Sequence, residues 1–141
     1  MTRTVAFQLG KLGQIATGRF ADRLAPHGLR PRHCAVMELL ADGPKVQLDL
    51  ARAIGVTPSV VVDMLDELEK LDVLRRVRDT ADRRRQLIEL TAEGQKLRRK
   101  AVLLARETDE ELLAALTAKQ ATALRQVLNQ VASASGIPAV E

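Results

Sequence analysis

The sequence predicts a mainly helical fold that includes one small β-hairpin. Apolar residues recur every three or four positions through most of the chain, which is the spacing of amphipathic helices. Only residues 73–90 change to a two-residue alternation, which is typical of half-buried strands. Residues 75–85 contain six arginines and two aspartates, a net charge of +4, so the hairpin carries the strongest charge.

Size and composition fit one packed domain, residues 1–141. Of the 141 residues 46% are hydrophobic, which is ample for a core. A net charge of +4 fits a polyanionic partner such as nucleic acid. The single cysteine excludes an internal disulfide and favours a reducing compartment. Since no apolar run has the length of a membrane span and the N-terminus lacks a secretory signal, we expect a cytoplasmic protein without a membrane partner.

Residues 5–25 are predicted to form the first helix, because apolar side chains recur there three or four positions apart. Three glycines in this segment weaken the prediction, since glycine has a low helix propensity. Pro26 and Gly28 then break the chain, and Pro31 lies near the start of a second helix that ends around Ala41.

Two further helices follow with a tight turn between them. The first, Gln47 to Ile54, has apolar residues at helical spacing, and Gly55 supplies a left-handed stop. Thr57 can cap the second helix with its hydroxyl, and Pro58 falls at the first helical position, where a missing N–H costs nothing. The predicted buried stripe comprises Val61, Met64, Leu65, Leu68 and Leu71. Residues 58–71 hold four acids and one lysine, a net charge of −3.

The hairpin follows directly. Val73 and Val77 alternate with arginines, and Ile88 and Leu90 alternate with polar residues, which predicts two half-buried strands. The segment between them, Asp79 to Arg85, is too polar for a core and is predicted to be the loop.

Two helices are predicted to complete the chain. Thr91 can cap a long helix over residues 92–113, and the T-x-x-Q pattern of residues 117–120 forms a capping box for a last helix that ends near Ala134. The tail, residues 136–141, is expected to fray. The end helices carry apolar stripes that pack either within the chain or against a second copy.

Three motifs connect these elements. GLRPRHCAVMELL spans residues 28–40, D-x-x-D-R-R lies at Asp79, Asp82, Arg83 and Arg84, and L-T-x-x-G lies at Leu90, Thr91 and Gly94. Over nearly the whole chain these motifs resemble the MarR family of winged helix-turn-helix transcription regulators. The resemblance implies a mainly α fold with a small β-hairpin wing, in which a winged helix-turn-helix at about residues 29–91 is flanked by N- and C-terminal dimerisation helices at about 5–25 and 92–134. It also implies a homodimer.

The resemblance further implies a sequence-specific regulator of transcription, in the family's commoner mode a repressor, that binds a pseudo-palindromic operator in double-stranded DNA. The helix beginning at Thr57 would lie in the major groove, and Arg84 would enter the minor groove while Asp82 holds its guanidinium. The candidate DNA-binding residues are Thr57, Pro58, Ser59, Val60, Val62, Asp63, Arg75, Arg76, Arg78, Asp82, Arg83, Arg84 and Arg85.

Some of these candidates have a second interpretation. Val60 or Val62 could touch a thymine methyl group or simply pack in the core. Asp63 could accept a hydrogen bond from a cytosine amino group, or repel phosphates and so exclude poor registers. The arginine-rich loop could be only solvated. The family often has polar or basic side chains near residues 60–63, where this chain has three valines and Asp63, and this departure argues against strong base readout by the helix.

The resemblance also implies release by a small anionic or phenolic effector, because family members are often relieved by such ligands. Arg19 and His33 are candidates for ligand contacts, and each also fits a surface residue or a satisfied group at the edge of the core. Cys34 is expected to pack in the second helix. The alternative is an oxidant sensor, in which His33 lowers the pKa of the thiol.

Other functional classes fit less well. Two histidines and one cysteine offer no convincing metal site or nucleophile–base pair, so we expect no enzyme, no metal and no cofactor. The serious alternative is a winged-helix protein-interaction module, which the acidic helix at residues 58–71 favours; a non-specific DNA-binding protein is another. The six arginines of the hairpin favour DNA, and a steep salt dependence of binding to duplex DNA would separate these functions.

Overall fold

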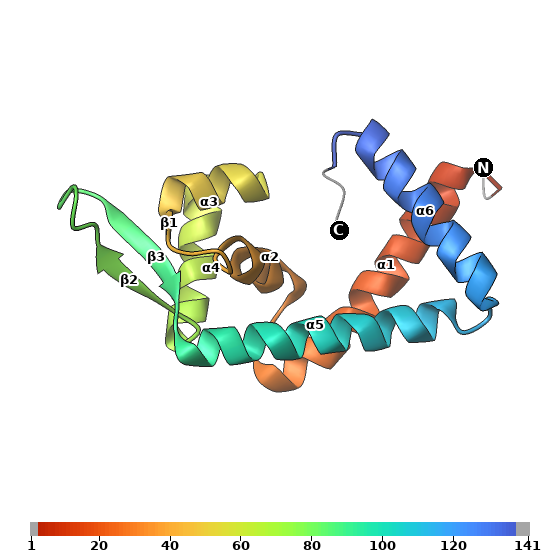
Figure 1. Cartoon of the computed structure of the whole chain (residues 1–141), viewed down its shortest axis with the longest axis horizontal. Coiled ribbons are helices and arrows are strands. Elements are labelled where there is room, and N and C mark those ends of the chain that lie inside the picture. The colour runs from red at the N-terminus through yellow and green to blue at the C-terminus, as the bar shows by residue number, and fades with distance from the viewer. Residues whose placement is uncertain (1–2, 138–141) are drawn as a thin grey trace. The chain divides into compact units, whose positions relative to one another are not determined.

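The computed structural model describes residues 3–137, which form six α-helices, one 3₁₀ turn and three strands (Figure 1). In chain order the elements are α1 (Val5–Leu24), η1 (Ala25–His27), α2 (Pro31–Leu39), β1 (Lys45–Val46), α3 (Gln47–Ile54), α4 (Pro58–Lys70), β2 (Leu74–Arg78), β3 (Gln86–Leu90), α5 (Ala92–Leu113) and α6 (Ala118–Ala134). The chain forms two compact units, one up to Arg106 and one from Glu107. The predicted fraying of residues 138–141 concerns a segment outside the described residues.

The predicted helix ends are confirmed where a local signal defines them. Gly55 ends α3 in the left-handed conformation, with φ of 76°. The Thr57 hydroxyl accepts a hydrogen bond from the backbone N–H of Val60 at the start of α4. Residues 117 and 120 form the predicted capping box of α6. The end of α2 is the exception, since this helix stops at Leu39 rather than near Ala41.

The sheet has one strand more than predicted. Its antiparallel order is β1-β3-β2, with Leu74 opposite Leu90 and Arg78 opposite Gln86. The additional strand, β1, is only two residues long and pairs with the other edge of β3. A two-residue strand shows no alternation, so periodicity could not reveal it. Because Val46 pairs with Leu87, β1 brings the start of α3 next to the loop end of the hairpin.

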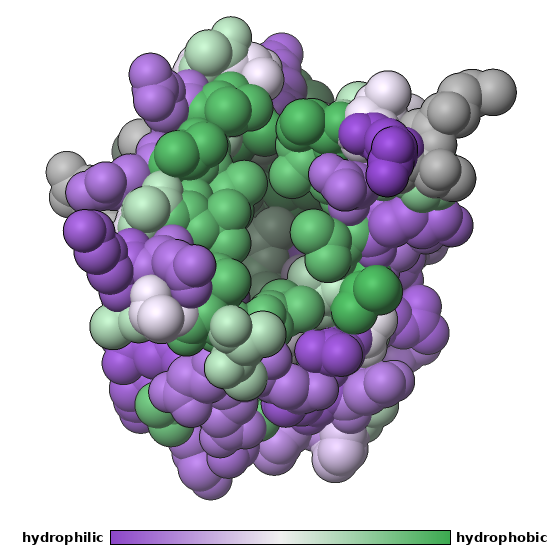
Figure 2. Space-filling model, turned by 90° about the vertical axis from the view of Figure 1, so that its right-hand side faces the viewer, coloured by the Kyte–Doolittle hydropathy of each residue, from purple (hydrophilic) through white to green (hydrophobic). Residues whose placement is uncertain are grey.

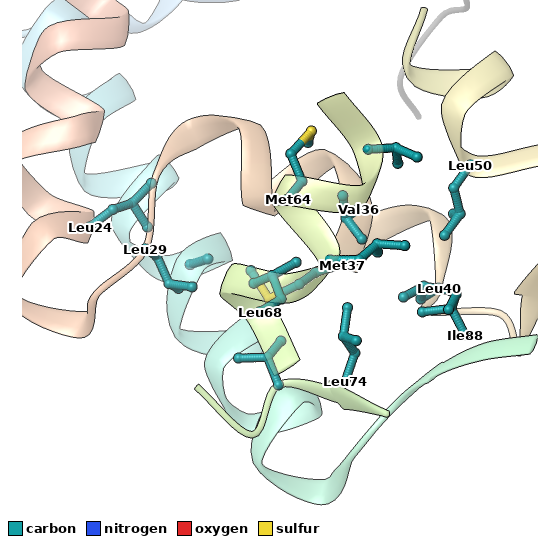
Figure 3. Packing of buried hydrophobic residues seen from close by; sticks show 14 of the residues in the cluster. Leu24, Leu29, Val36, Met37, Leu40, Leu50, Met64, Leu68, Leu74 and Ile88 are labelled. Carbon is teal, nitrogen blue, oxygen red and sulfur yellow. The ribbon is translucent and has the colours of Figure 1, made fainter. Parts of the chain in front are cut away.

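The core of the first unit lies between α2, α3, α4 and the sheet. Figure 3 shows Met37 of α2, Leu68 of α4 and Leu74 of β2 around a common centre, and all three are buried. Four of the five residues predicted for the buried stripe of α4 are fully buried, namely Val61, Met64, Leu65 and Leu68, while Leu71 is partly buried. The helical period predicted from the sequence therefore identifies the face of α4 that packs.

The terminal helices expose apolar side chains. In α1 these are Val5, Phe7, Leu9, Leu12 and Ile15, and in α6 they are Leu124, Val127, Leu128 and Val131. Figure 2 displays exposed apolar side chains of this kind in green. Over residues 3–137 none of the helices is both long and apolar enough to cross a membrane.

The L-T-x-x-G motif forms the joint between the sheet and α5. Thr91 donates its hydroxyl hydrogen to the backbone carbonyl of Asp72 and accepts a hydrogen bond of 2.9 Å from the Gly94 N–H. Asp72 adopts a left-handed φ of 57°, a conformation that aspartate tolerates better than most residues. A Cβ atom at Gly94 would lie 1.9 Å from the carbonyl oxygen of Val73, so α5 can approach the sheet this closely only with glycine there.

Gly94→Ala is expected to destabilise the fold by about 1–3 kcal/mol, the usual cost of overpacking, although alanine favours helix. The matched control is Gly10→Ala in α1, where no atom would lie within 4 Å of the added Cβ. This control should be neutral or stabilise by up to about 1 kcal/mol. Urea unfolding of the two variants measures both effects, and equal stabilities would contradict the tight joint.

Candidate nucleic-acid interface

The start of α4 is exposed, as a helix that enters a DNA groove requires. Thr57, Pro58, Ser59 and Val60 are all exposed, and the Thr57 and Ser59 hydroxyl oxygens lie 3.1 Å apart. Val60 is 38% exposed, whereas Val62 is half-buried. Neither valine is fully buried, and Val60 is the more accessible of the two for a methyl contact.

Arg76 of β2 neutralises two carboxylates of α4. Its Nη2 lies 2.7 Å from Asp66 Oδ1, and its Nη1 bonds Glu69 Oε2. The Arg76 side chain is only 20% exposed, so it faces the helix rather than solvent. The sequence suggested a DNA contact for this arginine. In the structure, Arg76 instead connects the sheet to α4.

Glu67 of α4 is bound from α2. Arg32 Nη2 donates to both carboxylate oxygens of Glu67, at 2.7 and 2.8 Å, and His33 Nε2 lies 2.6 Å from Glu67 Oε2. The hydrogen bonds from Arg32 and His33 lower the pKa of Glu67 to about 2, so this carboxylate is charged at neutral pH. Arg32 was not among the residues predicted from the sequence, because its role depends on the packing of α2 against α4.

These contacts compensate the acidity of α4. Three of its four carboxylates are paired with arginines from other elements, Asp66 and Glu69 with Arg76 and Glu67 with Arg32. Within residues 3–137, Asp63 is the one α4 carboxylate without an ion pair. The net charge of −3 counted along the sequence therefore overstates the negative charge that this face presents to a partner.

The wing loop, residues 79–85 between β2 and β3, is held in its conformation by hydrogen bonds to its two aspartates. Asp79 accepts a hydrogen bond of 2.9 Å from the Ala81 N–H, and Asp82 accepts one of 3.0 Å from the Arg84 N–H. Asp82 Oδ1 also lies 3.6 Å from Arg84 Nε, the contact expected between these residues, while the Arg84 side chain stays 94% exposed. The D-x-x-D-R-R motif thus folds a loop that projects arginine into solvent.

A basic hollow of about 590 Å³ lies between the wing and the start of α3. Its lining consists of Val46, Gln47, Leu48, Arg78, Arg83, Arg84, Arg85 and Gln86, four of which are arginines and none of which is acidic. The hollow brings together four of the six predicted wing arginines. Arg75 lies apart, since its Nε lies 2.5 Å from Glu89 in the neighbouring strand. Sequence reasoning missed Gln47 and Leu48, because only the pairing of β1 with β3 places them here.

His33 is held as a neutral, buried imidazole. It is 2% exposed, its Nδ1 accepts a hydrogen bond of 3.1 Å from the Arg30 N–H, and its Nε2 donates to Glu67. Burial lowers the pKa of His33 below 6.5, against the opposing effect of Glu67. Both ring nitrogens are engaged within the protein, so His33 is not retained as a candidate ligand contact.

The suggestion that His33 makes Cys34 reactive is wrong. Burial and, to a lesser extent, the negative charge of Glu38 raise the pKa of the Cys34 thiol to about 11. A thiol with this pKa is protonated at neutral pH and is a poor nucleophile. The structure therefore favours the alternative that Cys34 packs in α2, where it lies against the hydrophobic core.

Comparisons with known proteins agree on one family. The family model of the MarR family matches residues 30–85. The transcriptional regulator HosA from Escherichia coli O127:H6 is 35% identical over 131 residues, which cover 92% of this chain and 96% of HosA.

Two solved structures extend the similarity to three dimensions. The transcriptional repressor CouR bound to a 23-mer DNA duplex is 27% identical, with a TM-score of 0.80 over 93% of this chain and 94% of CouR. The Mycobacterium tuberculosis MarR family protein Rv2887 in complex with salicylic acid is 26% identical, with a TM-score of 0.75 over 91% of this chain and 96% of that protein.

The neutral His33 makes stability depend on pH. Because the folded state lowers the pKa of His33, the unfolded chain takes up the proton first, and stability falls as the pH drops below about 7.5 toward the folded pKa. Glu67, with a pKa of about 2, stays charged in this range. His33→Gln should lessen this loss, since an amide can replace both hydrogen bonds without titrating. Urea unfolding at pH 8 and pH 6 measures the difference, and identical pH profiles would refute the assignment.

Proposed function

The chain belongs to the MarR family of transcriptional regulators, and we propose that it acts as a homodimeric repressor that binds a pseudo-palindromic operator in double-stranded DNA. The observation that carries this proposal is the basic hollow, in which four wing arginines gather beside the start of α3. A surface of this charge density suits a phosphate backbone. CouR, which shares the fold, has been solved on a DNA duplex.

Each part of the interface has a plausible partner on DNA. The exposed start of α4, with Ser59 and Val60, suits the major groove, where hydroxyls bond base edges and methyl groups contact thymine. The Arg84 side chain, 94% exposed on the wing, is accessible to a narrow minor groove, whose negative potential attracts arginine. The phosphate backbone between the two grooves would then cross the hollow, near Arg83 and Arg85.

The unpaired Asp63 gives α4 a further means of discrimination. Its carboxylate can accept a hydrogen bond only, so it favours a cytosine amino group and disfavours phosphates and other acceptors. The other three α4 carboxylates form ion pairs with arginines. The helix therefore does not present the acidic surface that would favour a protein partner. We therefore prefer duplex DNA to a protein as the partner of this surface. A steep salt dependence of the affinity for duplex DNA distinguishes the two.

The exposed apolar side chains of α1 and α6 support the homodimer. Five large hydrophobic side chains are exposed along α1 and four along α6. Apolar stripes of this size are uncommon on the surface of a monomer and are typical of an interface. A dimer with two-fold symmetry would present two winged elements to half-sites about one helical turn of DNA apart.

A small anionic or phenolic effector would release the repressor. Rv2887, which has the same fold, was solved with salicylic acid, a small aromatic carboxylate. Arg19, half-buried in α1, remains the candidate contact for the anion of such a ligand. Titration of the DNA complex with salicylate tests this part of the proposal.

Arg84→Ala is expected to weaken operator binding at least tenfold, about 1.4 kcal/mol, because the variant loses the arginine placed for the minor groove. Fluorescence anisotropy on a duplex from the upstream region of the gene measures the affinity at about 150 mM salt. Arg99→Ala on α5 removes the same charge from an exposed helix surface outside the hollow and serves as the control. Unchanged affinity of Arg84→Ala would overturn the assignment of the wing.

Leu12→Glu is expected to dissociate the dimer, since it places a carboxylate in an apolar stripe where Leu12 is 56% exposed in the single chain. The dimer dissociation constant should rise about a hundredfold or more, on the order of 2.7 kcal/mol. Analytical ultracentrifugation provides the measurement. Thr80→Glu, the same added charge on the exposed wing loop away from α1, is the control, and equal dissociation constants for the two variants would exclude α1 from the interface.

A further inference from the structure

Arg32 lies on the same surface as the exposed part of α4 although it belongs to α2. A surface hollow of about 330 Å³ is lined by Arg32 together with Val60, Asp63, Asp66, Glu67 and Lys70 of α4. Val60 and Asp63 are the α4 residues proposed to contact bases. Arg32 therefore borders the surface on which DNA would lie.

The charges around this hollow are balanced once ion pairs are counted. Arg76 engages Asp66, and Arg32 engages Glu67. Lys70 and Asp63 remain, one of each sign, and neither has an ion pair within residues 3–137. The lining thus offers hydrogen-bond donors and an acceptor without a large net charge, so it can approach both the edges of bases and the phosphates that flank them.

Only one of the three guanidinium nitrogens of Arg32 donates hydrogen bonds to another residue within residues 3–137. Its Nη2 makes both hydrogen bonds to Glu67, whereas its Nη1 and Nε make none within residues 3–137. The side chain is 40% exposed. Glu67 is itself fixed by His33, so the carboxylate holds the guanidinium in one orientation with donors left for another acceptor.

We propose that Arg32 is a DNA-contacting residue, and that Glu67 is a positioning residue that holds it. Arg32 donates hydrogen bonds from Nη1 and Nε to an acceptor oxygen or nitrogen of the bound duplex, either a phosphate or the edge of a guanine. In this way α2 supplies a guanidinium to the surface of α4, a helix that contains no arginine of its own. The inference rests on the proposed function, since it requires that the chain bind DNA.

The test removes both charges of the pair at once. Arg32→Gln combined with Glu67→Gln leaves the net charge unchanged, and the amide oxygen introduced by Glu67→Gln can still accept the hydrogen bond from His33. If Arg32 served only to neutralise Glu67, this double variant would bind DNA like the wild type. A direct contact predicts an affinity at least about fivefold lower, the effect of one lost hydrogen-bonding contact to DNA.

The matched control is Lys96→Gln combined with Glu93→Gln. This pair lies on α5 with a distance of 3.7 Å between Lys96 Nζ and Glu93 Oε2, and its removal also preserves net charge. Anisotropy titrations on the upstream duplex compare both double variants with the wild type, and thermal unfolding verifies that each is folded. Equal affinities for all three proteins would overturn the contact. Absence of DNA binding by the wild type itself would instead overturn the proposed function.

A salt titration and a binding-site selection identify the acceptor. Loss of a phosphate contact lowers the slope of log affinity against log salt by about 0.9 and affects all sequences alike. Loss of a guanine contact leaves this slope unchanged and relaxes the preference at one base pair of the selected sites. Either result, accompanied by the lower affinity, supports Arg32 as a contact from outside the recognition helix.

Discussion

The burial of one face of α4 is the constraint on which the remaining structure depends. Val61, Met64, Leu65 and Leu68 are each almost completely removed from solvent, and burying a side chain of this kind contributes about 1.5–3 kcal/mol. This packing fixes the rotation of the helix about its axis. It thereby determines that Val60 and Asp63 face outward and that the three other carboxylates face neighbouring elements, where arginines of α2 and β2 meet them.

The ion pairs of α4 position this helix relative to α2 and β2 more than they add to the free energy of folding. Exposed salt bridges contribute at most about 1 kcal/mol, and the carboxylates of Asp66, Glu67 and Glu69 are between 36% and 49% exposed. Their more important effect is positional. Arg76 connects α4 to β2, whose continuation is the wing, so the groups proposed for the major and minor grooves belong to one connected body.

Much of the fold could be predicted from the sequence because its signals are local. The N-cap at Thr57, the left-handed Gly55 and the stripe of α4 depend only on neighbours along the chain, and the bounds of α3 and α5 follow from signals of the same kind. The short strand β1 carries no periodic signal, and its pairing with β3 depends on residues far away in the sequence. That pairing decides which residues line the basic hollow.

The candidate site was predicted less completely for the same reason. The exposure of Arg84 and its contact with Asp82 follow from a motif within one loop. The burial of Arg76 against α4 and the place of Arg32 beside Glu67 depend on tertiary packing, so counting charge along the helix suggested a negative surface that the fold largely compensates. His33 likewise was a candidate for a ligand contact from the sequence, whereas the packing of α2 encloses it.

The close joint at Gly94 has a mechanical consequence. Only Thr91 separates β3 from α5, and the carbonyl oxygen of Val73, directly before β2, lies against Gly94 in the first turn of the helix. Thr91 also bonds the carbonyl of Asp72 and the N–H of Gly94, so the first turn of α5 is attached to the chain before β2 as well as to the end of β3. The two strands of the wing and the first turn of α5 therefore move as one body, and a force that displaces this turn displaces the wing with it.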